Sequence, residues 1–351
     1  MKDINSGSIN TLDGMISRAT DICIVTHMKP DGDAIGSSTA MYHYLRNQGK
    51  SPRIVLNDPY PGYLSFLISD DMEKDVVTYA DNPSEASAAI TGSDLIICLD
   101  FNAFHRTDRL ESHLSEARGA KILIDHHLNP ARELFDLSFS ETEVSSASEL
   151  LFHILVRMPG VEENVSRLGK ACAESLMTGM TTDTNNFANS VFPSTLHMAS
   201  DLLEAGADRD YILNRLYNQY GEGRLRLMGH MMKDLLKITG DGVAYIVLDR
   251  STQRKYNVSE GDTEGFVNMP LSIADVRMSI LAKEDDDRIR ISIRSKKGTS
   301  ANMCARMFFN GGGHENAAGG RLYVPENVGS INETGEYIEE KTHIFFNDES
   351  N

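Results

Sequence analysis

Three side chains that can bind a metal ion lie close together near the start of the chain. His27, Asp31 and Asp33 follow the apolar run 22–25, and glycines stand among them. An apolar run predicts a buried strand, and the glycines predict a tight turn into a helix. In an open α/β sheet, ligands bind outside the carboxyl ends of the strands. The spacing therefore predicts three potential metal ligands at the end of one strand.

Further apolar runs, and one predicted helix, also end in carboxylates or imidazoles. The residues concerned are Asp100, Asp125, His126, His127 and Asp183. A single aspartate at such a position is usually a turn or helix cap, and a lone histidine is usually a hydrogen-bonded core or surface residue. Here the carboxylates converge on one edge of the predicted sheet, where they would repel one another unless a cation held them. The whole set therefore favours metal binding.

The ligand types indicate which metals and which chemistry to expect. Carboxylates and imidazoles without thiolates suit Mn²⁺, Mg²⁺, Fe²⁺ or Zn²⁺ and do not suit a structural zinc site. The set is too large for one open catalytic ion. It suits two ions about 3.5–4 Å apart that share a carboxylate, an arrangement that hydrolyses phosphate esters.

Composition limits the class of protein. The 351 residues are 40% hydrophobic and 24% charged, which is typical of a globular protein with room for two domains. No apolar run approaches the ~20 residues that span a bilayer, and the polar residues 1–10 do not resemble a secretory signal. We therefore expect a cytoplasmic protein without a membrane partner. The four cysteines are far apart in the sequence and fit reduced, mostly buried thiols.

Net charge limits the partners. A formal charge of −17 argues against a stable complex with a large nucleic acid, because phosphate binding needs a positive field. It does not exclude a small phosphorylated substrate. The apolar, methionine-rich stretch 227–236 is compatible with a homodimer interface and equally with a buried core.

Element patterns predict an α/β protein with two domains. Continuous apolar strands separated by helical segments predict a parallel N-terminal sheet covered on both faces. The composition changes near 239–242, after which short strands alternate. We expect a catalytic domain over 1–205, a helical connector over 206–240, a smaller α/β substrate-binding domain over 241–325, and an acidic tail with weak structural signals over 326–351.

The second domain carries a candidate anion site. Glycines 311–313 precede His314, and two alanines and two further glycines follow. One glycine would suffice to end a helix, whereas this run lets backbone approach a ligand closely. The alternating arginines 288, 290 and 294, followed by two lysines, are either a solvated strand edge or a phosphate contact.

These motifs together resemble a known superfamily. His27-x3-Asp31-Gly32-Asp33, Asp100, Asp125-His126-His127 and Thr182-Asp183-Thr184 are similar to the four motifs of the DHH phosphoesterases. Gly311-Gly312-Gly313-His314 with the following Ala-Ala-Gly-Gly is similar to their DHH-associated C-terminal domain. The resemblance covers about residues 10–325.

The resemblance implies roles for the metal-binding residues. His27 and Asp31 would hold one ion. Asp33, His126 and Asp183 would hold the other, and Asp100 would bridge the two. His127 would face the substrate phosphate and assist the leaving group, and Asp125 would orient a histidine. The metals would be two divalent ions, Mn²⁺ in the first place and Mg²⁺ as the alternative.

The resemblance also implies substrate contacts. In the second domain these are Arg294, Ser295, Gly312, Gly313 and His314. In the first domain Arg109, and beside it Arg106, are candidates for contacting phosphate. The N-terminal domain would then hold the scissile phosphate, and the smaller domain would grip the remainder of the substrate.

Two-domain members of this length resemble the nanoRNase/pAp phosphatases, so we expect Mn²⁺-dependent hydrolysis of short oligoribonucleotides, of 3′-phosphoadenosine 5′-phosphate (pAp), or of both. A phosphodiesterase for cyclic or linear di-adenylate would use the same metal site, and an exopolyphosphatase is a further alternative. A nucleotide-binding module without activity is a different class. Its expected mark would be a lost metal ligand, and none of the motif ligands is missing.

Overall fold

The computed structural model describes residues 4–219, 221–258 and 261–348. They form two compact units, Met1–Gln219 and Tyr220–Asn351. The domain boundaries expected from the sequence at 205, 240 and 325 remain predictions. Among the described helices, none combines the length and apolar character needed to cross a bilayer.

The first unit is built on a six-stranded parallel sheet, as predicted. Its strands are β1 Ile22–Val25, β2 Arg53–Leu56, β3 Val76–Thr78, β4 Leu95–Leu99, β5 Ala120–Asp125 and β6 Leu137–Ser140. Their order is β3-β2-β1-β4-β5-β6, and every neighbouring pair is parallel. The central strands β1 and β4 are buried along their whole length, because helices cover both faces of the sheet.

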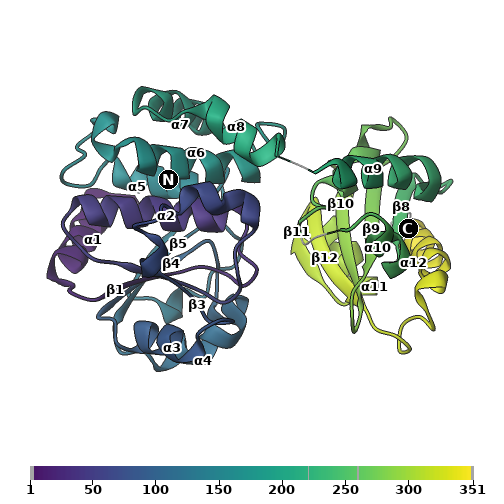
Figure 1. Cartoon of the computed structure of the whole chain (residues 1–351), viewed down its shortest axis with the longest axis horizontal. Coiled ribbons are helices and arrows are strands. Elements are labelled where there is room, and N and C mark those ends of the chain that lie inside the picture. The colour runs from purple at the N-terminus through teal and green to yellow at the C-terminus, as the bar shows by residue number, and fades with distance from the viewer. Residues whose placement is uncertain (1–3, 220, 259–260, 349–351) are drawn as a thin grey trace. The chain divides into compact units, whose positions relative to one another are not determined.

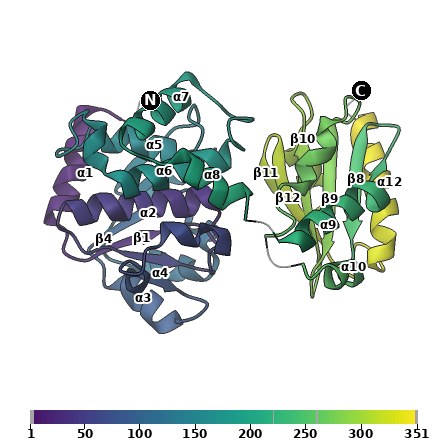
Figure 2. The ribbon, with the colours of Figure 1, turned by 45° about the horizontal axis from the view of Figure 1, so that its top comes forward.

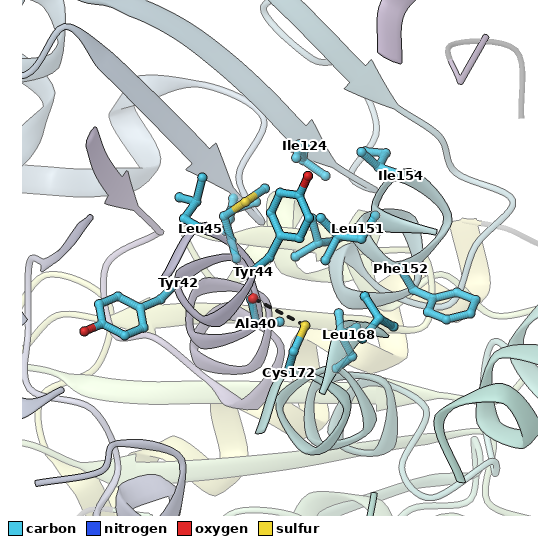
Figure 3. Packing of buried hydrophobic residues seen from close by; sticks show 14 of the residues in the cluster. Ala40, Tyr42, Tyr44, Leu45, Ile124, Leu151, Phe152, Ile154, Leu168 and Cys172 are labelled. Atoms are coloured by element: carbon cyan, nitrogen blue, oxygen red, sulfur yellow. Dashed lines mark hydrogen bonds between the residues drawn. The ribbon is translucent and has the colours of Figure 1, made fainter. Parts of the chain in front are cut away.

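Eight helices of the first unit are α1 Ser6–Arg18, α2 Gly32–Asn47, α3 Pro83–Thr91, α4 Glu111–Glu116, α5 Ala147–Leu155, α6 Lys170–Asp183, α7 Pro193–Glu204 and α8 Arg209–Tyr217. Helices α1, α2 and α5 cover one face of the sheet, α6 packs against α2 and α5, and α3 and α4 cover the other face (Figure 1). Figure 3 shows side chains of α2, α5 and α6 packed together in the larger core, where the Cys172 thiol lies 3.5 Å from the Ala40 carbonyl.

The second unit contains a mixed sheet of β7 Lys237–Ile238, β8 Val243–Leu248, β9 Met278–Glu284, β10 Ile289–Ser295, β11 Gly312–His314 and β12 Ala317–Leu322. The order is β11-β12-β10-β9-β8-β7, and only β8 and β9 pair in parallel. Its helices are α9 Glu222–His230, α10 Arg250–Lys255, α11 Ala301–Phe308 and α12 Thr334–Asp348. Figure 2 shows β10, β12 and β11 side by side at one edge of this sheet.

Two segments differ from the expectation. The acidic segment 326–351 contains α12, and Ile338, Phe345 and Phe346 on this helix are buried in the core of the second unit. Charged and polar residues, Glu339 to His343, separate Ile338 from the two phenylalanines and hide their helical spacing in the sequence. The stretch 227–236, which lies within the expected helical connector 206–240, is not one continuous α-helix, because α9 ends at His230 and a π-helical turn follows. Leu227 and Met231 are buried in the second unit's own core, which accounts for the apolar character of this stretch.

Candidate metal centre

Glycines let two helices of the first unit cross closely. A Cβ added to Gly36 on α2 would lie 2.7 Å from the Ser175 carbonyl oxygen and 2.8 Å from the Gly179 nitrogen, both on α6. A Cβ on Gly179 would lie 2.6 Å from Oδ1 of Asp33. Because no side chain separates the helices, the N-terminal end of α2 and the C-terminal end of α6 meet. This crossing brings Asp33 and Asp183 to the same edge of the sheet.

One group of potential ligands forms at the end of β1. Nε2 of His27 lies 3.8 Å from Oδ1 of Asp31 and 3.5 Å from Oδ2 of Asp100. Nδ1 of His27 is 2.8 Å from the Met28 carbonyl oxygen, so it carries the proton and leaves Nε2 as the ligand atom. Asp31 also caps α2, because its Oδ1 accepts from the backbone N–H groups of residues 33 and 34.

A second group lies beside it. Nε2 of His126 is 3.3 Å from Oδ2 of Asp183 and 3.5 Å from Oδ1 of Asp100. The potential ligand atoms of Asp33, His126 and Asp183 all lie within 4.8 Å of one another, as do those of His27, Asp31 and Asp100. The structure therefore brings together the residues of each predicted set. Their assignment to particular ions remains a prediction.

A third group adds His127. Its Nδ1 lies 2.7 Å from Oδ1 of Asp125 and 3.8 Å from Oδ1 of Asp100. Asp125 is fully buried and its other oxygen accepts from the His127 backbone N–H at 3.2 Å. Asp125 therefore holds the His127 ring in place, the kind of contact expected of it from the sequence.

Asp100 lies at the centre of these groups. Its φ is 63°, a left-handed backbone conformation that is uncommon outside glycine, asparagine and aspartate. Its N–H donates to the Ile124 carbonyl oxygen of the neighbouring strand at 3.1 Å. Asp100 is buried, and its Oδ1 has no hydrogen-bond partner among the described residues. A buried carboxylate oxygen of this kind needs a cation or a donor.

The electrostatics of the cluster also favour a cation. Burial and the charge of Asp100 raise the pKa of Asp33 to about 7. Burial and the charge of Asp33 raise the pKa of Asp183 well above its usual value. Burial alone would lower the pKa of His126, but the nearby carboxylates of Asp100 and Asp183 raise it to about 10. These raised pKa values show that the crowded carboxylates favour added positive charge, so the residues fit divalent metal ions.

Sequence reasoning missed the residues that support Asp33. Its two carboxylate oxygens accept from the N–H groups of Ala147 and Ser148, at 2.6 and 2.9 Å, at the N-terminus of α5. Glu149 on the same helix is fully buried and accepts from the Ser145 N–H at 2.9 Å and from the Thr195 hydroxyl at 2.6 Å. The Ser-x-x-Glu spacing at 146–149 is a capping signal that could have drawn attention to Glu149 at this helix start.

The predicted phosphate contact of the first unit has other partners. Nη2 of Arg109 lies 3.1 Å from the Asn57 carbonyl oxygen and 3.4 Å from Oδ1 of Asp58, and its guanidinium stands 5.2 Å from the ring centre of Tyr79. Arg106 is half-buried, and its carbonyl oxygen accepts from the N–H of Met28, next to His27. Among the described residues, none bonds to the Arg106 guanidinium.

Strand register in the second unit aligns two predicted substrate residues. His314 on β11 pairs with Ala317 on β12, which pairs with Arg294 on β10. The Arg294 guanidinium donates to the Ile293 carbonyl oxygen at 2.9 Å and has no acidic partner among the described residues. Burial lowers its pKa from the usual value. An unpaired, partly buried guanidinium is a candidate anion contact.

The remaining predicted substrate residues lie close by. Ser295, the last residue of β10, is buried, donates its hydroxyl to the Thr299 carbonyl oxygen at 2.7 Å and accepts from the Asn316 amide at 3.0 Å. Gly312 and Gly313 begin the edge strand β11. The sequence-predicted substrate residues of the second unit therefore gather at one end of β10 and on β11.

Comparison with known proteins gives matches along most of the chain. Residues 21–180 match the DHH family, N-terminal domain, and residues 227–340 match the DHHA1 domain. The chain is 29% identical over 314 residues to the bifunctional oligoribonuclease and PAP phosphatase NrnA of Bacillus subtilis, covering 88% of this chain and 91% of that protein. It is 38% identical to a solved exopolyphosphatase-related protein from Bacteroides fragilis, with a TM-score of 0.90 and 98% of both chains covered.

A more distant structural similarity concerns the fold alone. The structure of an exonuclease RecJ bound to manganese has a TM-score of 0.54 and is 13% identical, with 95% of this chain and 93% of that chain covered.

Proposed function

Because this chain belongs to the DHH family and is a hydrolase of phosphoester bonds, we propose that it hydrolyses short oligoribonucleotides and pAp. The observation that carries the proposal is the cluster of carboxylates and imidazoles around Asp100, whose groups match the ligand sets expected for two ions. The relative named oligoribonuclease and PAP phosphatase matches over both units and supports the choice of substrate.

The metal site in this proposal holds two divalent ions, with Mn²⁺ preferred. His27, Asp31 and Asp100 would hold one ion, and Asp33, His126, Asp183 and Asp100 would hold the other. Bound there, the ions would supply an activated water and offset charge on the phosphoryl oxygens.

In this proposal, residues of the chain orient the side chains of the site, and one of them exchanges a proton. Ala147 and Ser148 fix both oxygens of Asp33 through their N–H groups. Asp125 accepts from Nδ1 of His127 and so sets the direction of the ring. Nε2 of His127 is then the nitrogen that exchanges a proton with the leaving oxygen, which is the role we propose for it.

Substrate binding in this proposal involves the second unit. Arg294 contacts a phosphate, and Ser295, Gly312, Gly313 and His314 complete that contact. Arg109 of the first unit belongs to the same proposal, and to reach a phosphate its guanidinium must leave Asp58.

The test is a substrate panel with added Mn²⁺, analysed by mass spectrometry. We expect mononucleotides from di- to pentanucleotides and inorganic phosphate from pAp, and no product from an Asp100→Asn variant. Folded, metal-loaded protein that turns over neither substrate would overturn the proposal. Faster turnover of polyphosphate or of a cyclic di-adenylate would replace it with the corresponding alternative.

A further inference from the structure

Strands β10 and β12 of the second unit differ between their two faces. One face is buried against α11, and its apolar residues are Ile289, Ile291, Ile293, Ala318 and Leu322. The other face consists of Arg290, Ser292 and Arg294 on β10 and Ala317, Gly319 and Arg321 on β12, all of them half-buried or exposed. This second group is called the open face below.

Register arranges the open face in three rows. Arg294 pairs with Ala317, Ser292 with Gly319, and Arg290 with Arg321. Side chains of directly paired residues stand on the same side of a sheet. Long cationic side chains therefore stand at both ends of the open face, and a floor of small residues lies between them.

Glycines next to the open face are of two kinds. At Gly311 an added Cβ would lie 1.9 Å from the Gly319 carbonyl oxygen, at Gly313 it would lie 2.6 Å from that of Ala317, and at Gly320 it would lie 2.3 Å from that of Phe309. Close contact with backbone requires glycine at these three positions. Packing of the hairpin therefore explains part of the glycine pattern without any ligand.

Gly319 is different. The nearest atom to an added Cβ is the Ile291 carbonyl oxygen at 3.6 Å, an ordinary contact, and its φ is not among the positive values. The fold would accept a side chain here, and a glycine inside a strand weakens the strand. A glycine that packing does not require is typical of a position where a ligand approaches the backbone closely.

Charge indicates the kind of ligand. The open face contains three arginines and no carboxylate, in a chain whose net charge is −17. The guanidinium of Arg321 is exposed and bonds to none of the described residues. Arg294 has no acidic partner either, whereas Arg290 pairs with Asp285 at 3.0 Å. An anion is therefore the complementary ligand.

The distance between the two ends of the open face indicates which anion it can bind. Ala317 and Arg321 are four residues apart on β12, so the two cationic rows are about 13 Å apart. A single nucleotide does not cover this distance, but a short chain of linked nucleotides does. We infer that the open face from Arg294 to Arg321 binds the sugar–phosphate backbone of an oligonucleotide, with Arg321 contacting only substrates longer than a dinucleotide. This inference rests on the proposed function and deepens it.

The test compares substrates of different length. Arg321→Ala is expected to raise KM about tenfold for a tetranucleotide and to leave KM for pAp unchanged. Gly319→Val is expected to weaken tetranucleotide binding similarly while Tm stays level, because a β-branched residue suits a strand. Gly320→Ala is the matched structural control, and it is expected to lower Tm. Lys237→Ala on β7, an exposed cation at the opposite edge of the same sheet, is the charge control and is expected to change neither KM.

A binding measurement in a variant without hydrolysis distinguishes this inference from the proposed function. In the Asp100→Asn background, a labelled tetranucleotide is expected to bind more tightly than a labelled mononucleotide, and Arg321→Ala is expected to reduce the salt dependence of that difference. Wild type that hydrolyses no nucleotide would overturn the proposed function but leave this binding result as a test of the open face. An equal effect of Arg321→Ala on all lengths, an equal effect on polyphosphate, or no effect would overturn the inference.

Discussion

The two sheets of this protein present functional groups in opposite ways. At the carboxyl end of the first sheet, aspartates and histidines come from β1, β4, β5, α2 and α6, and most of them are buried or half-buried. In the second sheet, adjacent strands supply arginines and small residues to a face that solvent reaches. The first arrangement fixes atoms for metal binding, and the second offers a surface on which substrates of different length can lie. We therefore expect substitutions in the first to be severe and those in the second to be graded.

The largest effect is expected at Asp100. Its Oδ1 and Oδ2 each lie 3.5 Å from a histidine of a different ligand group, so Asp100→Asn removes the charge that both groups share. We expect kcat/KM for pAp and for a dinucleotide to fall by about 10³-fold or more, measured with saturating Mn²⁺. Asp81→Asn, an exposed aspartate outside these groups, is the control. Activity of Asp100→Asn within tenfold of wild type would show that the cluster is not the catalytic centre.

The next effect concerns the support behind Asp33. Buried Glu149 accepts hydrogen bonds from Ser145 and Thr195 on one oxygen, and an amide in its place keeps one acceptor oxygen but loses the negative charge that these donors stabilise. We expect Glu149→Gln to lower the free energy of unfolding at pH 7 by about 3 kcal/mol, measured by urea denaturation.

The pH dependence of this effect has a defined sign. Burial alone would raise the pKa of Glu149, but its hydrogen bonds lower it from 4.5 to about 2. A lowered pKa contributes stability above pH 4.5, and that contribution is lost as the pH falls from about 4.5 toward 2. The difference between wild type and Glu149→Gln should therefore shrink at pH 3. A difference that is the same at pH 7 and pH 3 would show that the charge of Glu149 does not matter.

A smaller, graded effect is expected in the second sheet. Arg294→Ala removes a guanidinium that has no acidic partner among the described residues, so it should weaken substrate binding without unfolding the unit. We expect KM to rise about tenfold, corresponding to roughly 1.4 kcal/mol, with kcat changed less than threefold. Lys237→Ala, an exposed cation on β7 at the opposite edge of the sheet, is the control. A decrease in kcat with unchanged KM would indicate that Arg294 takes part in catalysis, and it would contradict the difference proposed between the two sheets.

The two sheets differ in how much of their functional sites could be predicted from the sequence. The cluster of metal ligands could be predicted, because the last residues of parallel strands lie at the same edge of the sheet. His27, Asp100 and His126 were therefore found at the ends of apolar runs. The roles of Gly36 and Gly179 could not be predicted. These glycines are required by the close crossing of two helices, which brings together residues far apart in sequence. Glu149 looked like one more residue of an amphipathic helix, and only the fold shows its contact with Thr195.

In the second sheet the sequence indicated which residue types are involved, but it did not indicate which contacts they make in the fold. The alternating arginines indicated a half-solvated strand, which the burial of β10 confirms. Which glycines the packing requires depends on the Phe309 and Ala317 carbonyl oxygens that approach them across the hairpin. For the same reason, the partners of Arg109 at Asn57 and Asp58 could not be read from spacing.

The measurement that tests the account most directly is the metal content of matched variants. Asp31 and Asp33 are two residues apart but belong to different ligand groups, one with His27 and one with His126. After Mn²⁺ loading and removal of free metal, elemental analysis and calorimetric titration should find that Asp31→Ala and Asp33→Ala each lose a different one of two binding steps, and that Asp100→Asn weakens both. If Asp31→Ala and Asp33→Ala lose the same binding step, or if wild type binds a single ion, the division of this cluster into two metal sites is contradicted.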